Sequence, residues 1–183
     1  DVFANVTYFM GNELHGGACT FQGWMQQFFE LASILWSCVI GLTLWSSVVR
    51  QTRVFATRMK LHIAVWGISA FVSFLPFSTN SYGESGSWCW IKGDEAGTYW
   101  RYAAFYVLLW IIFFCNVYCY SVVRKTINGF VKVSVATTQQ VKLKKLAEQL
   151  KWYPLILVFA WTLPTISRIQ QTLDPHCDVF WLT

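Results

Sequence analysis

Four apolar stretches, each long enough to cross a lipid bilayer, constrain the fold of this chain more than any other feature. They cover residues 19–49, 61–77, 102–123 and 152–169, and residues 1–10 add a shorter one. A helix needs about 20 mainly apolar residues to cross a hydrocarbon core of about 30 Å, and in lipid only helices and closed barrels satisfy every backbone polar group. The sequence therefore predicts an all-α transmembrane helix bundle that forms a single domain.

The composition argues against a soluble fold. Apolar residues make up 55% of the chain and charged residues only 13%, about half the charged share of an average soluble domain. The core of a soluble protein could explain one apolar segment, but not four of spanning length with short polar connections between them. We therefore expect an integral membrane protein.

Lysine and arginine are concentrated in two of the connections between the spans. The flanks of the first carry Arg50, Arg53, Arg58 and Lys60, and those of the second carry Arg124, Lys125, Lys132, Lys142, Lys144, Lys145 and Lys151. By the positive-inside bias, residues 51–60 and 125–151 are expected in the cytoplasm, and residues 78–100 and 171–183 outside the cell. Nucleic acid is not an expected partner, because cations beside membrane spans meet anionic lipid or a cytoplasmic protein.

The cysteines divide by their position relative to the membrane. Three lie inside the predicted spans, namely Cys38, Cys115 and Cys119, and a thiol there usually packs as a small apolar group. Cys19 starts the first complete span and Cys89 lies in the outer connection, so both face the oxidising side. We infer a disulfide between Cys19 and Cys89. Two alternatives stay open: both thiols are free, or Cys177 pairs with one of them.

A polar stripe follows one face of the first complete span. It consists of Gln22, Gln26, Glu30, Ser33, Ser37 and Gly41, at helical spacings of three or four residues. Such a face turns inward, because a polar group without partners is costly in lipid. The last three residues suit close contact between helices, whereas the first three lie in the outer half, where a ligand cavity can open.

Glu30 is the sharpest functional candidate in this stripe, since an ionisable residue deep in a span is a functional candidate by default. Its partner could be Arg168, which shares a face of the last span with Trp161 and Thr165, or a positive group of a ligand. Alternatively, Glu30 is a buried neutral acid that only donates a hydrogen bond.

Several short motifs occur in an order that points to one receptor family. They are Cys19 with Gln22-Gly23, Trp66-Gly67, Trp88-Cys89-Trp90-Ile91, Val123-Arg124-Lys125 with Ile127-Asn128, Lys144-Lys145-Leu146, Pro154-Leu155-Ile156, and Arg168. In this set the chain resembles the cyclic-AMP-receptor-like branch of the seven-transmembrane, G-protein-coupled receptors, known from slime moulds and with relatives among animal orphan receptors. Two features depart from the family: Ile68-Ser69 stands where a proline is frequent, and no Asp-Arg-Tyr triplet follows the third helix.

The resemblance implies a receptor fragment that runs from the end of helix two through helix six, with helices one and seven outside the given residues. It implies a disulfide from helix three to the outer loop, which Cys19 and Cys89 match, and an extracellular ligand in the outer half of the bundle. The expected ligand contacts are Gln22, Gln26, Glu30, Trp90, Lys92, Tyr102, Tyr106, Trp161, Thr165 and Arg168. Lys92, Arg101 and Arg168 could meet an anionic ligand; Lys92 and Arg101 could instead be solvated or contact lipid headgroups.

Signalling, on this resemblance, opens the cytoplasmic end of helix six to a heterotrimeric G protein. The expected G-protein contacts are Arg50, Arg53, Arg124, Lys125, Lys144 and Lys145, each of which could contact anionic lipid instead. The alternative function is a channel or transporter fragment that uses the Glu30 stripe, although we find neither an internal repeat nor charged rings. An enzyme is not expected, nor a metal or other cofactor, because the catalytic and metal-binding motifs are missing and the three histidines lack ligand-like spacing.

Overall fold

The computed structural model describes residues 16–50, 58–85 and 88–132, together with 161–162, 165–166 and 169–170. Helix α2 (Gly17–Trp45) continues into the π-helical turn η1 (Ser46–Arg50), and α3 (Arg58–Phe74) continues into the 3-10 turn η3 (Leu75–Thr79). Strands β1 (Tyr82–Glu84) and β2 (Cys89–Ile91) follow, then α4 (Glu95–Arg101), the π-helical turn η4 (Tyr102–Tyr106) and α5 (Val107–Lys132). The expected span over residues 1–10, most of the span over 152–169 and residues 171–183 lie outside the described residues.

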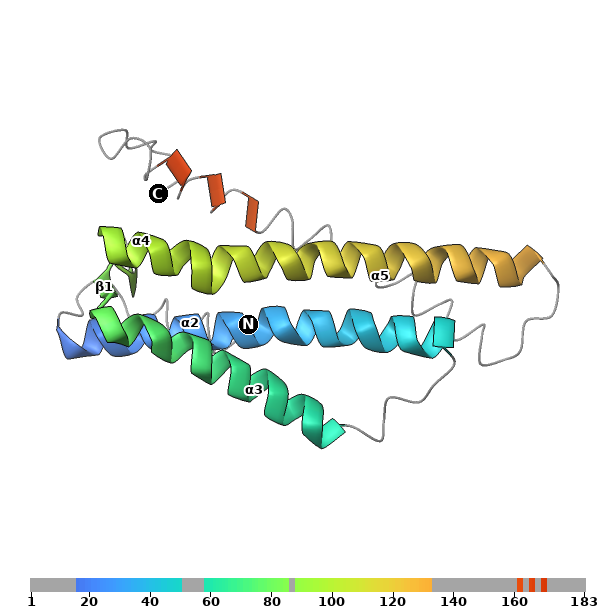
Figure 1. Cartoon of the computed structure of the whole chain (residues 1–183), viewed down its shortest axis with the longest axis horizontal. Helices are drawn as coiled ribbons and strands as arrows, with labels where there is room; N and C mark the ends of the chain where they lie inside the picture. The colour runs from blue at the N-terminus through green and yellow to red at the C-terminus, as the bar shows by residue number, and fades with distance from the viewer. Residues whose placement is uncertain are drawn as a thin grey trace.

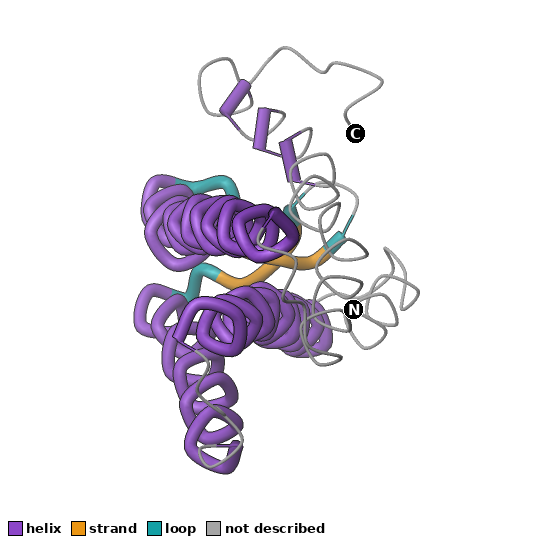
Figure 2. Tube along the Cα trace, turned by 90° about the vertical axis from the view of Figure 1, so that its right-hand side faces the viewer, coloured by secondary structure: helices purple, strands orange, loops and turns teal. Residues whose placement is uncertain are grey.

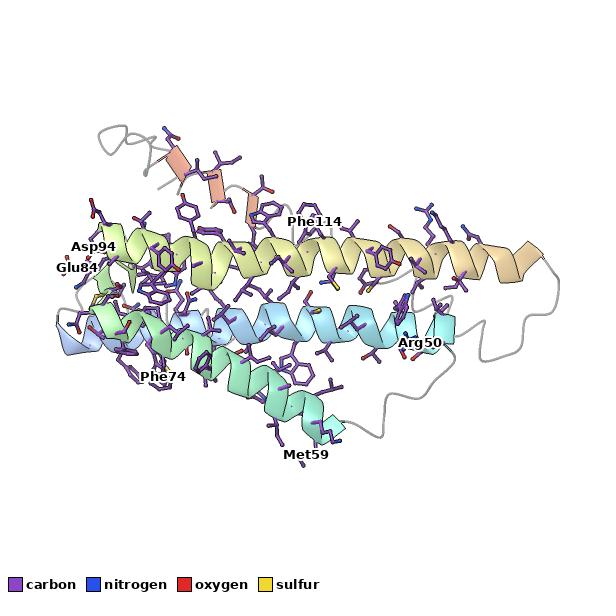
Figure 3. All side chains as sticks on the ribbon, in the orientation of Figure 1. Arg50, Met59, Phe74, Glu84, Asp94 and Phe114 are labelled. Carbon is purple, nitrogen blue, oxygen red and sulfur yellow. A yellow bond between two sulfur atoms is a disulfide. The ribbon has the colours of Figure 1, made fainter. Side chains whose placement is uncertain are left out.

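Within the described ranges, three helical stretches are long and apolar enough to cross a membrane, namely Gly17–Arg50, Met59–Thr79 and Glu95–Gly129. Large apolar side chains remain exposed along them, including Met59, Ile63, Phe71, Ile111 and Phe114. Figure 3 shows Met59 and Phe114 pointing away from the bundle. Apolar side chains on the outside and polar ones inside are what lipid demands of a helix bundle, so the predicted all-α transmembrane fold is confirmed.

The three long helices meet at the end of the molecule that carries the strands. Helices α2 and α5 lie side by side along the long axis, whereas α3 approaches α2 near β1 and diverges from it toward the opposite end (Figure 1). Viewed end-on, the two strands lie between the α2 and α3 pair and the α4 and α5 segment (Figure 2). The hairpin is therefore inserted between the helices at one end of the bundle.

A buried hydrogen bond between side chains joins α2 to α5 halfway along their contact. The Asn116 side-chain amide donates to the Ser37 hydroxyl at 2.9 Å, and both residues are buried. Gly41 lies one turn further along α2, where a Cβ atom would collide with the Asn116 side-chain oxygen. Small residues thus let the two backbones approach closely. The helix-contact role predicted for Ser37 and Gly41 is confirmed.

The largest apolar core lies beneath the hairpin rather than at the middle of the bundle. It combines Leu31 and Ile34 from α2, Tyr82, Trp90 and Ile91 from the strands, Phe105 and Tyr106 from η4, and Leu109 and Ile112 from α5. A smaller cluster of Leu44, Val48, Val123 and Ile127 closes the contact of α2 and η1 with α5 at the other end. The hairpin is therefore part of the core, and its position is set by the helices around it.

Candidate ligand-binding site

A disulfide fixes the hairpin to the N-terminal end of α2. Strands β1 and β2 pair antiparallel, with Tyr82 opposite Ile91 and Glu84 opposite Cys89. Cys89 is bonded to Cys19, with the two Cα atoms 5.3 Å apart. The disulfide predicted from the sequence is confirmed, and it leaves neither thiol available to Cys177.

Close backbone packing adds a second attachment between the hairpin and the helices. A Cβ atom on Gly23 of α2 would lie 3.1 Å from the Trp90 Cα and 3.2 Å from the Tyr82 ring, so a larger residue would require the strands to move away by a few tenths of an ångström. The Tyr82 hydroxyl donates to the Ser73 carbonyl of α3 at 2.7 Å. Burial raises the pKa of the Tyr82 phenol, which keeps it a neutral donor at physiological pH.

Arg101, the last residue of α4, fastens the other side of the hairpin. Its guanidinium donates to the Ile91 carbonyl, at 2.8 Å from Nε, and to the Ser85 hydroxyl at 2.7 Å. It also lies 5.8 Å from the centre of the Trp90 ring. Only 6% of Arg101 is exposed, so one of its two predicted alternatives, solvation or contact with lipid headgroups, is wrong. Arg101 is buried because its guanidinium donates to the Ile91 carbonyl of the hairpin.

Trp90 is the centre of an aromatic cluster under the hairpin. Its ring centroid lies 5.5 Å from that of Phe105 and 6.3 Å from that of Tyr106, edge to face in both cases. Phe105 in turn packs edge to face on Trp161, at 5.0 Å, and the Tyr102 ring lies 5.8 Å from Tyr106. The cluster thereby connects the hairpin with Trp161 of the last predicted span. Four predicted ligand residues, Trp90, Tyr102, Tyr106 and Trp161, are brought together here.

The first three residues of the polar stripe are inside the bundle. Gln22, Gln26 and Glu30 are all buried, with exposures of 1%, 2% and 8%. The Gln26 amide donates to the Glu30 carboxyl group at 3.3 Å. Their burial confirms the inward orientation that the helical spacing predicted. Buried side-chain amides and a carboxyl group offer both donors and acceptors, which suits recognition of a polar ligand.

The remaining predicted ligand residues are not gathered at this cluster. Lys92 follows β2, and its ammonium group donates to the Asn80 carbonyl at 3.0 Å. Thr165 is buried, and its hydroxyl donates to the Trp161 carbonyl one turn earlier, at 2.6 Å. Arg168 lies outside the described residues. Among the residues that the structure describes, no group of histidine, cysteine and acidic side chains is arranged to hold a metal ion.

The family of the chain follows from comparison with known proteins. A family model described as "Slime mold cyclic AMP receptor" matches residues 2–181. The chain belongs to the slime mold cyclic AMP receptor family. The resemblance that its motifs predicted is therefore confirmed, and together with the three apolar helices it identifies a multi-pass membrane protein.

Three curated relatives agree with this family. "G-protein coupled receptor 1" of Arabidopsis thaliana is 30% identical over 190 residues, which cover 100% of this chain and 58% of that protein. "Cyclic AMP receptor-like protein A" of Dictyostelium discoideum is 28% identical over 131 residues, 70% of this chain and 34% of that protein. "G-protein coupled receptor 157" of Mus musculus is 28% identical over 149 residues, 70% of this chain and 43% of that protein. The chain thus spans 34% to 58% of the length of these relatives.

Some of the predicted G-protein contacts are exposed at the end of the bundle away from the hairpin. Arg50 is exposed and its guanidinium lies 4.9 Å from the Trp45 ring centre, while Arg124 and Lys125 are exposed on α5. Figure 3 shows Arg50 at the opposite end of the bundle from Glu84 and Asp94. Arg53, Lys144 and Lys145 lie outside the described residues.

Sequence reasoning missed Gln27, which is fully buried between the hairpin and η4. Its Oε1 atom accepts from the Trp90 indole at 2.8 Å, and its Nε2 atom donates to the Ala104 carbonyl at 3.4 Å. Gln27 adjoins the stripe residue Gln26 in the sequence but does not share its helix face. The available signal was the indole of Trp90, since a buried tryptophan usually finds an acceptor.

Proposed function

We propose that this chain forms the central part of a G-protein-coupled receptor that binds an extracellular ligand in the outer half of its bundle. The observation that carries the proposal is the convergence of Trp90, Phe105 and Trp161, which gives a ligand under the hairpin a direct contact with helix six. The family assignment and the names of the relatives supply the receptor class. Ligand contacts come from Gln22, Gln26, Glu30, Trp90, Lys92, Tyr102, Tyr106, Trp161, Thr165 and Arg168.

Signalling requires that the ligand prefer one of two arrangements of the bundle. A ligand that displaces Phe105 or Trp161 changes the packing of helix six at its outer half, and the cytoplasmic end of that helix opens in response. The opening presents the cationic residues Arg50, Arg53, Arg124, Lys125, Lys144 and Lys145 to a G protein. The hairpin then lies outside the cell and the segment over residues 125–151 inside it.

The orientation is tested by labelling the full-length protein in intact cells. Single cysteines are introduced at Glu84 and at Lys132 in a variant whose Cys177 is replaced with serine, and are exposed to a thiol reagent that does not cross membranes. We expect labelling at the first position without permeabilisation, and at the second only after it. Equal labelling of both positions in intact cells contradicts the proposed topology and, with it, the receptor assignment.

The receptor class is tested with the full-length protein in liposomes that carry heterotrimeric G proteins of each class. We expect the protein to accelerate nucleotide exchange by at least one class, with cyclic AMP as the first agonist probe and no proton or ion flux. Flux without any nucleotide exchange contradicts the proposal and supports the channel or transporter alternative that the Glu30 stripe would serve.

Replacing Glu30 with glutamine tests the charge of the polar stripe. We expect agonist potency to fall by about 10-fold to 100-fold, because a hydrogen bond to a charged group contributes about 1.5–3 kcal/mol. Dose-response curves are measured in the exchange assay at matched surface expression. Ser37→Ala, further along the same face of α2, is the control and is expected to keep the potency of the unmodified protein. An unchanged curve for Glu30→Gln contradicts a role of Glu30 in binding.

A further inference from the structure

The helix that follows the hairpin contains a π-helical turn at the candidate site. Between α4 and α5, residues Tyr102–Tyr106 form η4 and continue both helices without a break. Single π turns inside α-helices are rare and frequently occur at functional sites. This turn carries two of the proposed ligand contacts, Tyr102 and Tyr106, as well as Phe105.

The π turn reconciles two sets of contacts that a regular helix would bring into conflict. Before it, α4 is held by Arg101 on the hairpin and by the Trp100 indole, which donates to the Thr79 hydroxyl at 2.9 Å. After it, α5 is held by Leu109 and Ile112 in the apolar core. One residue turns an α-helix by about 100°, so the extra residue of a π turn lets both faces meet their partners.

Gln27 connects this turn to the hairpin with a side chain whose orientation is determined by its partners. An indole nitrogen only donates and a backbone carbonyl only accepts. The Gln27 oxygen must therefore face Trp90, at 2.8 Å, and its nitrogen must face the Ala104 carbonyl of η4, at 3.4 Å. No part of Gln27 is exposed to solvent, so bulk water does not compete for either group.

We propose that Gln27 is the positioning residue of the ligand site, because it fixes Trp90 and the π turn that carries Tyr102 and Tyr106 in one arrangement. The role as a positioning residue for ligand contacts rests on the proposed receptor function. Without the amide, the Ala104 carbonyl loses its link to α2 and the indole of Trp90 loses its acceptor. Phe105 packs between Trp90 and Trp161, so the loss also reaches the last span.

The test compares Gln27→Leu and Gln27→Met with Ser37→Ala in the full-length protein in lipid nanodiscs. Leucine and methionine keep the apolar bulk of the side chain and remove the amide, and methionine also keeps its unbranched shape. Ser37→Ala removes another buried hydrogen bond between α2 and α5, the one from Asn116, outside the candidate site. It therefore controls for a general loss of stability.

Two readouts report on position rather than on stability. The first is amide hydrogen exchange of residues 102–108, which we expect to accelerate at least 10-fold in both Gln27 variants and to stay unchanged in Ser37→Ala. The second is fluorine NMR of protein labelled with 5-fluorotryptophan, with resonances assigned through Trp90→Phe and Trp161→Phe. We expect both resonances to shift in the Gln27 variants and neither to shift in Ser37→Ala.

The proposal is overturned if both Gln27 variants fold and leave exchange and resonances unchanged, or if Ser37→Ala changes them as much. Neither readout uses an agonist or a G protein. A protein that shows the expected shifts but no nucleotide exchange therefore retains the positioning role and loses the receptor function. Nucleotide exchange combined with unchanged resonances retains the receptor function and rules out the positioning role of Gln27.

Discussion

Trp90→Ala is expected to lower the free energy of unfolding by about 3–5 kcal/mol, as for other large aromatic side chains removed from a core. The side chain is 4% exposed and packs on Phe105 and Tyr106. Its removal also deprives Gln27 of the indole donor, which adds the cost of a buried acceptor without that partner. Thermal unfolding of the purified full-length protein in detergent, monitored by thiol accessibility, measures the effect.

Two further variants separate the contributions of packing and hydrogen bonding. Trp90→Phe keeps an aromatic ring but removes the indole N–H, so we expect the free energy of unfolding to fall by about 1–3 kcal/mol. Trp66→Ala is the matched control, because Trp66 of α3 is 40% exposed and packs on Phe28 at 5.7 Å. It is expected to cost less than either change at Trp90. Equal losses at the two positions would contradict the central role of Trp90 in the core.

The sequence predicted those parts of the fold in which the bilayer limits the possible backbone structures and the direction of polar side chains. Lipid permits few backbone structures, so apolar length alone predicted the helices. Helical spacing predicted that Gln22, Gln26 and Glu30 share one buried face. The distribution of lysine and arginine predicted that Cys19 and Cys89 lie on one side of the membrane, and the disulfide inferred from this, with free thiols and Cys177 as alternatives, is confirmed.

The parts that could not be predicted depend on contacts between segments distant in the sequence. Helix α4 begins at Glu95, inside the segment expected to be an outer connection, and its cap is the Asp94 side chain, which accepts from the Gly97 amide at 2.7 Å. The burial of Arg101 depends on the Ile91 carbonyl. The π turn η4 could not be predicted from its own sequence. It depends on how α4 and α5 are rotated about their axes, and contacts with distant segments determine that rotation.

Removing the disulfide is the second change with a large expected effect, about 2–5 kcal/mol. The bond joins residues separated by 70 positions and holds the hairpin at the N-terminal end of α2. Without it, the strands keep their packing in the apolar core and at Gly23, and the hydrogen bonds of Tyr82, Arg101 and Trp90. We therefore expect the hairpin to become accessible to protease well below the temperature at which the helices unfold.

The experiment uses the double variant Cys19→Ser and Cys89→Ser, because a single change would leave a thiol that could form a disulfide with Cys177 under oxidising conditions. Thermal unfolding and proteolysis of residues 82–91 are followed with and without reductant. The unmodified protein and Cys119→Ser, which removes a free buried thiol, should both lose stability on reduction, whereas the double variant should already be at the lower value. If reductant leaves the unmodified protein unchanged, the bond does not support the hairpin. The packing of the hairpin in the apolar core, with the hydrogen bonds of Tyr82, Gln27 and Arg101, would then be enough to hold the aromatic cluster.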